Sequence, residues 1–203
     1  MAGLSRVWNS KRFRWMAIVI LAMAILGVFA VRFTLFSDGT VPHTGFQLSD
    51  PKGDVSLSVG SSYPGMTDIV QGSLNVSGIS LTVNLITADT VSSVGEEESV
   101  QWDVLLVFEN DTDVFKTYSM ALVMNSTGFY STLQDVDSNA TEPCNASFKG
   151  STLVTQLSPG ELSNATKIEW SITSTYQKYD ASGELVDLAS DSAPDKGLQT
   201  TNL

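Results

Sequence analysis

Cysteine and histidine are almost missing from this sequence, which holds one of each. A transition-metal site needs several such ligands, so His43 and Cys144 together fall short of the usual set. A serine–histidine–carboxylate site would have to use His43, and the chain contains no Gly-x-Ser-x-Gly segment to present a nucleophile. Glycine-rich phosphate-binding motifs are also missing. We therefore expect no enzyme activity, no catalytic residue, no metal-ligating residue and no cofactor, although the many carboxylates leave a paired-carboxylate glycosidase open.

Arginine is confined to the N-terminal part, where Arg6, Arg12, Arg14 and Arg32 accompany Lys11. All 22 aspartates and glutamates lie after residue 36, together with six lysines. Duplex binding depends on lysine and arginine that neutralise phosphates, so an acidic body without arginine argues against nucleic acid as a partner. Acidity of this kind is typical of a soluble, self-repelling surface.

The clearest positive signal is a run without charge over residues 15–31, which continues with mostly apolar residues to Phe36. As a helix, residues 15–36 would be about 33 Å long, enough to cross a hydrocarbon core of about 30 Å. Basic residues precede the run and acidic residues follow it, which places the N-terminus in the cytoplasm. We therefore predict a single-pass protein of the cell membrane, with a signal-anchor helix and an extracellular C-terminal body. A signal peptide cleaved near Ala30 is the alternative, because small residues stand there at the usual spacing.

Asparagine is uncommon, yet most of it occurs as Asn-x-Ser/Thr. Six of the nine asparagines do so, against about two expected by chance in a chain with this serine and threonine content. The motif is the acceptor of N-linked glycans on surface loops of secreted domains. Its enrichment agrees with the topology derived from charge. We predict glycosylation at Asn75, Asn110, Asn125, Asn139, Asn145 and Asn164.

Cys144 lies in a loop between two of these motifs, at Asn139 and Asn145. A single thiol cannot form an intramolecular disulfide. Three alternatives remain: an unreactive or glycan-shielded thiol, an intermolecular disulfide, and a nucleophile or ligand, for which activating neighbours are missing. An exterior chain rich in glycosylation motifs and without internal disulfides fits an archaeal or other prokaryotic surface protein.

Beyond the membrane segment, apolar residues alternate with period two, which is typical of half-buried strands. Turn-forming sequences such as "ENDTD" and "NSTG" separate these runs. Seven to nine strands over this length predict an all-β, antiparallel, immunoglobulin-like β-sandwich. We expect Trp102 and Trp170 in its core rather than on a sugar-binding platform. The alternating rows are Ile79, Leu81, Val83 and Leu85; Val100, Trp102, Val104, Leu106 and Phe108; Met120, Leu122 and Met124; and Ile168, Trp170, Ile172 and Tyr176.

These signals divide the chain into five parts. Residues 1–14 form a basic cytoplasmic tail, and residues 15–36 form the membrane helix. Residues 37–66, rich in glycine, serine and proline, form a stalk with a first edge strand. Residues 67–189 form the sandwich, and residues 190–203 form a polar C-terminal tail.

Two segments carry a resemblance to a known family. The strand "VLLVFENDTD" and the segment "LSPGELSNATKIEWSI" occur in the order found in telokin-like, immunoglobulin-fold extracellular domains of prokaryotic surface proteins. The resemblance covers residues 70–188 and implies an extracellular β-sandwich, without catalytic residues to transfer. Members of this family are often lipid-anchored, whereas this chain has a membrane span and no lipobox.

The segment 135–146 copies the first three positions of an EF-hand calcium loop. It lacks the glycine at the sixth position and the glutamate at the twelfth, so we predict no EF-hand. A solvated acidic loop is the main interpretation. A looser, weak calcium site on Asp135, Asp137 or Glu142 stays open.

The sequence therefore predicts a non-enzymatic, single-span cell-surface glycoprotein whose β-sandwich mediates protein–protein or envelope interactions. Its expected partners are the membrane, N-linked glycans and an envelope protein. A subunit of a pilus-like filament, packed through the hydrophobic helix, is an alternative, although "KRFRW" lacks the small residue of a pilin cleavage point. An extracellular ligand- or metal-binding domain is a further alternative.

Overall fold

The computed structural model describes residues 46–77 and 80–203. The predicted basic tail, the predicted membrane helix and residues 37–45 of the predicted stalk, which include His43, lie outside these residues. Within the described part of the chain, no helix combines the length and the apolar character that a membrane crossing requires.

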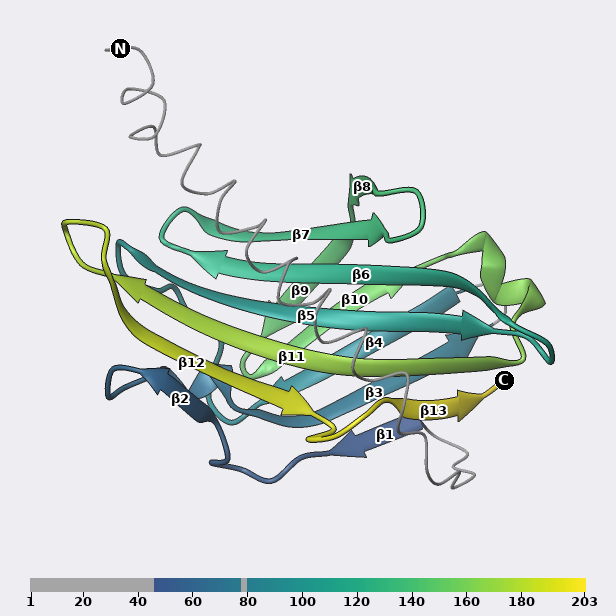
Figure 1. Cartoon of the computed structure of the whole chain (residues 1–203), viewed down its shortest axis with the longest axis horizontal. Coiled ribbons are helices and arrows are strands. Elements are labelled where there is room, and N and C mark those ends of the chain that lie inside the picture. Colours follow the sequence, from purple (N-terminus) through teal and green to yellow (C-terminus); the bar gives the residue numbers. More distant parts are fainter. Residues whose placement is uncertain (1–45, 78–79) are drawn as a thin grey trace, which may run out of the picture. The chain divides into compact units, whose positions relative to one another are not determined.

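Two antiparallel sheets make up the fold (Figure 1). The smaller sheet has five strands, in the spatial order β1 (Phe46–Ser49), β3 (Ile69–Ser77), β4 (Ser80–Thr87), β10 (Thr152–Leu157) and β9 (Asn145–Lys149). The larger sheet runs in the order β2 (Ser56–Val59), β12 (Leu185–Ala193), β11 (Lys167–Tyr179), β5 (Glu98–Glu109), β6 (Val114–Asn125), β7 (Gly128–Asp135) and β8 (Ala140–Pro143), with β13 (Gln199–Asn202) paired to β11. Short 3-10 helices η1 (Gly65–Thr67) and η2 (Gly160–Asn164) join strands. The predicted all-β antiparallel class is confirmed.

Strands β5 and β11 form the centre of the larger sheet. They pair continuously from Lys167 opposite Glu109 to Lys178 opposite Glu98. Every second residue points inward, and Trp102 and Trp170 are 0% exposed. Full burial of one large apolar side chain stabilises a fold by about 1.5–3 kcal/mol, so these two rows are a main source of stability. The predicted alternation and the predicted core position of both tryptophans are confirmed.

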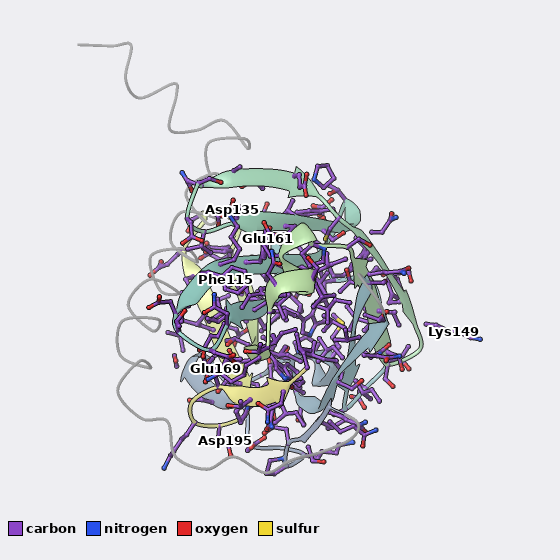
Figure 2. The ribbon with its side chains drawn as sticks, turned by 90° about the vertical axis from the view of Figure 1, so that its right-hand side faces the viewer. Phe115, Asp135, Lys149, Glu161, Glu169 and Asp195 are labelled. Carbon is purple, nitrogen blue, oxygen red and sulfur yellow. The ribbon has the colours of Figure 1, made fainter. Side chains whose placement is uncertain are left out.

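The smaller sheet supplies the facing half of the core, and side chains fill the space between the sheets (Figure 2). The two sheets come close at Gly72 of β3. A Cβ atom there would lie 2.7 Å from Ile172 Cδ1 and 3.0 Å from Trp170 Cζ3. Glycine therefore lets β3 pack directly against the central tryptophan. The inward residues of this sheet include Leu74, Leu81, Val83, Leu85 and Leu153.

The described residues form thirteen strands, more than the seven to nine that the sequence predicts. The additional strands are short. Strands β1, β2 and β8 lie at sheet edges, and β13 pairs with β11 beyond the end of β12. Strands β1, β2, β8 and β13 have four residues each, and β2 and β8 are exposed throughout. The alternation of Val55, Leu57 and Val59 predicts the first edge strand, which is β2. The other three show no clear alternation of apolar residues, so sequence periodicity does not reveal them.

The folded domain extends beyond the predicted sandwich at both ends. Residues 46–66, within the predicted stalk, contain β1, β2 and part of η1. Residues 190–203, the predicted polar tail, contain the end of β12 and all of β13. Thr201 is 2% exposed, and its Oγ1 accepts a hydrogen bond of 3.2 Å from Trp170 Nε1. The buried residues of the C-terminal segment are small or polar, which explains why the hydrophobic pattern ends too early there.

Candidate metal centre

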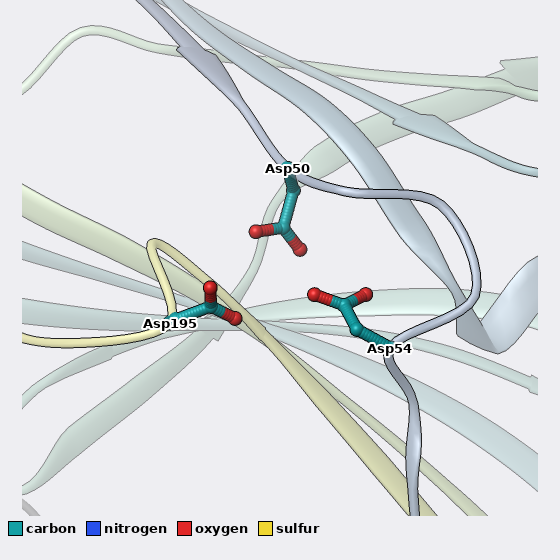
Figure 3. Close-up of side chains that lie close together, drawn as sticks. All are labelled: Asp50, Asp54 and Asp195. Atoms are coloured by element: carbon teal, nitrogen blue, oxygen red, sulfur yellow. The ribbon is translucent and has the colours of Figure 1, made fainter.

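Five aspartates from three separate segments gather beside the edge strands of the two sheets, and we call them the aspartate cluster. Asp50 and Asp54 lie in the loop between β1 and β2, and Asp68 lies between η1 and β3. Asp191 belongs to β12, and Asp195 follows it in the loop to β13. Carboxylate oxygens of Asp50, Asp54 and Asp195 lie within 4.8 Å of one another (Figure 3). Oxygens of Asp54, Asp68 and Asp191 also lie within 4.8 Å of one another.

Backbone hydrogen bonds hold two of these carboxylates in place. The loop from β1 to β2 crosses from the smaller to the larger sheet and turns at Gly53, whose φ of 91° favours glycine. Gly53 N donates a hydrogen bond of 2.9 Å to Asp68 Oδ2. Ile69 N, at the start of β3, donates one of 2.6 Å to Asp191 Oδ2, and Ser192 N donates one of 2.8 Å to Asp191 Oδ1. The carboxylates of Asp68 and Asp191 are therefore oriented before any ligand binds.

Two oxygens of the cluster are buried without a partner. Asp68 Oδ1 and Asp50 Oδ2 accept no hydrogen bond from the described residues, although Asp68 is 4% exposed and Asp50 is 9% exposed. Burial of an unpaired polar group is costly, and burial of an unpaired charge costs more. Native proteins satisfy most buried polar atoms, so each exception requires an explanation. A bound cation would explain the two unpartnered oxygens, and it would also explain the gathering of carboxylates around them.

The crowding changes the acidity of the cluster. Burial first, and then the negative charges of Asp191, Asp54, Asp195 and Asp68, raise the pKa of Asp50 to about 7. Burial also raises the pKa of Asp191 to about 6, against the lowering effect of its hydrogen bonds from Ile69 N and Ser192 N. The pKa of Asp68 is raised mainly by burial. The ionised cluster is thus electrostatically unfavourable unless positive charge enters it.

No lysine neutralises the cluster through an ion pair among the described side chains. The ion pairs there join Lys116 to Asp135, Lys167 to Glu109 and Glu169, and Lys178 to Glu98. Lys52 lies nearby and lowers the pKa of Asp68 only as a minor contribution. Its Nζ atom lies 3.5 Å from the carbonyl oxygen of Ala88. The carboxylates of the cluster therefore have no cationic side chain bound to them among the described residues.

The donor atoms are the kind that hard divalent cations prefer. Calcium takes six to eight oxygen ligands at about 2.3–2.6 Å, so two ligands on opposite sides of one ion lie about 4.6–5.2 Å apart. Each set of three aspartates, with its oxygens within 4.8 Å, is within the reach of one such ion. Softer metals favour histidine and cysteine, neither of which belongs to the cluster.

The comparisons give no relative for this chain: no protein-family model matches it, and no curated protein or solved structure is significantly similar. The telokin-like resemblance therefore remains a prediction from sequence.

The predicted glycosylation sites are spread over both sheets and their loops. Asn75 in β3, Asn139 after β7, Asn145 in β9 and Asn164 in η2 are exposed, and Asn110 is partly exposed. Asn75 lies in a strand, and its exposure there leaves room for a glycan. None of the six asparagines belongs to the aspartate cluster.

Asn125 differs from the other five, because it is 5% exposed. Its Oδ1 accepts hydrogen bonds of 2.8 Å from Thr127 N, 2.6 Å from Thr127 Oγ1 and 3.2 Å from Gly128 N. The side chain thus fixes the turn between β6 and β7. We expect a glycan to be disfavoured at this position of the folded domain.

Cys144 lies between β8 and β9 and packs, partly buried, against the edge of the core. Its carbonyl oxygen accepts a hydrogen bond of 2.6 Å from Ser131 Oγ, and its N–H donates one of 3.3 Å to the Ser131 carbonyl. Because the residue is partly exposed, the three alternatives for its thiol stay open.

The acidic loop after β7 is organised differently from the aspartate cluster. Asp135 forms an ion pair of 2.6 Å with Lys116 and accepts hydrogen bonds from Asp137 N and from both Ser138 N and Ser138 Oγ. These bonds, led by the one from Lys116, lower the pKa of Asp135 to about 2. Its oxygens already have partners, which supports the interpretation of a solvated structural loop. Among the described residues, the sets of acidic side chains close enough to hold a cation lie only in the aspartate cluster.

The sequence contains a signal for the cluster that periodicity does not detect. "DPKGD" (50–54) and "DSAPD" (191–195) are both Asp-x-x-x-Asp segments that contain proline. The first segment keeps its two carboxylates close together in one loop, whereas in the second Asp191 belongs to β12 and Asp195 to the loop that follows. Only the fold brings the two segments next to each other and to Asp68, because β1 and β12 lie in different sheets.

Proposed function

We propose that the β-sandwich is an extracellular calcium-binding domain and that the aspartate cluster is its binding site. The observation that carries this proposal is the buried, unpartnered Oδ1 of Asp68, which belongs to a set of three carboxylates within 4.8 Å. A calcium ion supplies the missing partner and compensates the repulsion among the carboxylates. Ion binding also joins the loop from β1, the start of β3 and β12, three segments of both sheets.

Calcium fits the cluster better than magnesium. Magnesium requires near-ideal octahedral geometry at about 2.0–2.1 Å and usually retains several waters. Calcium accepts irregular arrangements of carboxylates and releases water more readily. The aspartates here come from loops and strand ends that are far apart in sequence, an arrangement that suits the more tolerant ion.

Isothermal titration calorimetry of the full chain in detergent, stripped with a chelator, tests the proposal. Titration with calcium chloride should give a Kd between about 10⁻⁷ and 10⁻³ M, the range of sensor and extracellular sites. Asp68→Asn keeps an acceptor for Gly53 N but loses the charge and one ligand oxygen, so calcium binding should weaken at least about tenfold. Asp137→Asn, an exposed carboxylate outside the cluster, is the matched control and should bind normally. Absence of calcium heat in the unmodified chain would refute the proposal.

The immunoglobulin-like class is part of the proposal, and the strand order supports it. The order β3-β4-β10-β9 in one sheet corresponds to A-B-E-D of a variable-type immunoglobulin domain. The order β12-β11-β5-β6-β7 in the other corresponds to G-F-C-C′-C″. Trp102 in β5 then occupies strand C, where such domains bury a tryptophan. Strands β1, β2, β8 and β13 are additions to this core.

We also propose that the chain is a non-enzymatic surface glycoprotein, held by one N-terminal membrane span, that acts by contact with an envelope partner. The uncharged run over residues 15–31 and the charge asymmetry around it support the span. The exposure of Asn75, Asn139, Asn145 and Asn164 supports glycosylation.

Mass spectrometry of the protein from its native membranes tests the location. Peptides from residues 1–14 should be recovered from the mature chain, and glycan masses should occur at the exposed asparagines but rarely at Asn125. A mature N-terminus at Val31 would refute the anchor in favour of a cleaved signal peptide. Unmodified asparagines at all six motifs would refute glycosylation.

A further inference from the structure

We infer that the aspartate cluster holds two calcium ions that share Asp54. The inner ion is bound by Asp54, Asp68 and Asp191, and the outer ion is bound by Asp50, Asp54 and Asp195. This inference rests on the proposed calcium-binding function and adds the number of ions, their separate ligands and their different responses to calcium concentration.

The geometry divides the cluster into two sets. The described carboxylates form two groups of three with oxygens inside 4.8 Å, and Asp54 alone belongs to both groups. One calcium ion cannot bind oxygens that lie more than about 5 Å apart. A carboxylate has two oxygens, so Asp54 can offer one to each ion, as bridging carboxylates do in sites with two metals.

The unpartnered oxygens follow the same division. Asp68, whose buried Oδ1 has no partner, belongs to the inner set, and Asp50, whose buried Oδ2 has no partner, belongs to the outer set. Each set thus contains one buried carboxylate with an unsatisfied oxygen. One ion in each set places positive charge beside both carboxylates.

Charge balance also favours two ions. Five ionised aspartates carry a charge of −5, which one calcium ion reduces to −3 and two ions reduce to −1. Like charges at these separations repel strongly where burial limits the screening by water. The second ion therefore removes repulsion that the first ion leaves.

The two sets differ in exposure and in preorganisation. In the inner set, Asp68 is 4% exposed and Asp191 is 6% exposed, and backbone N–H groups hold both carboxylates. In the outer set, Asp54 and Asp195 are exposed. A preorganised, partly desolvated site binds more tightly than a mobile, hydrated one. The inner ion is thus the permanent one, and the outer ion responds to the calcium concentration outside the cell.

Among the described residues, no hydrogen bond joins the loop from β1 to β2 with the loop from β12 to β13. The outer ion would connect these two loops. Asp50 and Asp54 lie in the loop from β1 to β2, and Asp195 lies in the loop from β12 to β13. Occupancy of the outer set fixes the second loop against the first. We expect this edge of the domain to become more rigid as calcium rises.

Native mass spectrometry and calorimetry of the full chain with calcium chloride test the inference. The unmodified chain should bind two calcium ions, with the second at least about tenfold weaker than the first. Asp195→Asn should bind one ion with the affinity of the tighter site unchanged. Asp54→Ala should lose both ions or bind only one weakly, and alanine avoids the Asn-Val-Ser motif that asparagine would create there. Asp137→Asn should bind two ions, as the control.

The outcomes separate this inference from the proposed function. One ion in the unmodified chain, with Asp195→Asn unchanged, overturns the two-ion arrangement and leaves calcium binding intact. No ion in the unmodified chain overturns both. The count for the unmodified chain depends on no variant, so a variant that fails to fold does not prevent a decision.

Discussion

Replacing Trp102 with alanine is expected to lower the free energy of unfolding by about 3–5 kcal/mol, a large part of the 5–15 kcal/mol typical of a domain. Trp102 is 0% exposed and lies in β5, at the centre of the larger sheet. The substitution removes the contacts of the indole ring with both sheets and leaves a cavity that the long strand pairing of β5 with β6 and β11 prevents from collapsing. Denaturant titration in saturating calcium measures the loss.

Trp102→Phe separates packing from hydrogen bonding at the same position. Trp102 Nε1 donates a hydrogen bond of 3.0 Å to the carbonyl oxygen of Met66, which belongs to η1. Phenylalanine retains most of the ring but leaves this buried carbonyl unpaired, at a cost of about 1–3 kcal/mol. Tyr130→Ala, at an aromatic residue 41% exposed on β7, is the control and should cost less than about 1 kcal/mol. A loss below about 1 kcal/mol for Trp102→Ala would contradict the role of this residue in the core.

The same tryptophan connects the core to the aspartate cluster. Helix η1 immediately precedes Asp68, and side chains of the larger sheet hold it through its carbonyl groups. Trp102 bonds to Met66, and Ser174 Oγ donates a hydrogen bond to the carbonyl oxygen of Thr67. The orientation of Asp68 thus depends on residues of two central strands, β5 and β11. A rigid support of this kind is what a metal site needs in order to keep its ligands in place.

The sequence predicted the central strands because their side chains are large and strictly alternating. In β5 and β11 the buried rows consist of aliphatic and aromatic residues apart from Ser174, so the period of two is evident without any knowledge of their partners. The edge strands follow a different principle. β2 and β8 are exposed on both faces, and β13 buries Thr201, a polar residue. The alternation of Val55, Leu57 and Val59 still marks β2 in the sequence. The conformation of β8 and β13 depends on pairing with a neighbouring strand, which local sequence does not encode.

The aspartate cluster escaped prediction for a related reason. Asp50 and Asp195 lie far apart in the sequence, near the two ends of the folded domain's chain. Their segments are interpreted from composition as stalk and tail. What joins them is the pairing of β2 with β12 and the crossing of the chain from β1 to β2, both long-range features. The acidic segment that begins at Asp135 resembles a calcium loop in its sequence. The carboxylate of Asp135, however, forms an ion pair with Lys116. Local spacing of acids is therefore a poor guide to cation sites when ligands come from distant segments.

Calcium is expected to raise the melting temperature of the chelator-treated protein by about 5–11 °C at pH 7.5. A ligand at about one hundred times its Kd stabilises the folded state by about 2.7 kcal/mol. For a protein of this size, each kcal/mol corresponds to about 2–4 °C. Differential scanning calorimetry with calcium, with magnesium and with chelator measures the shift, and magnesium should give a clearly smaller one. Equal melting temperatures with calcium and with chelator would contradict the expected stabilisation.

The rise in melting temperature on calcium binding should also depend on pH. The raised pKa values of the aspartate cluster determine the direction of this dependence. Without calcium, burial and carboxylate repulsion raise the pKa of Asp50 to about 7 and that of Asp191 to about 6. A carboxyl whose pKa is raised in the folded state stabilises the fold when protonated, and this contribution is lost as pH rises through the folded pKa. The calcium-free protein should therefore melt at a higher temperature at pH 5.5 than at pH 7.5. Calcium replaces the protons, so its stabilising effect should be larger at pH 7.5. Asp50→Asn removes the group of the cluster with the larger shift and should reduce the pH dependence of the calcium-free protein. Burial also raises the pKa of Asp103, outside the cluster, to about 7, so Asp103 keeps part of this dependence in the variant. Asp135, whose pKa is lowered to about 2 by Lys116 and Ser138, contributes stability that is lost only at more acidic pH, so it does not obscure this window.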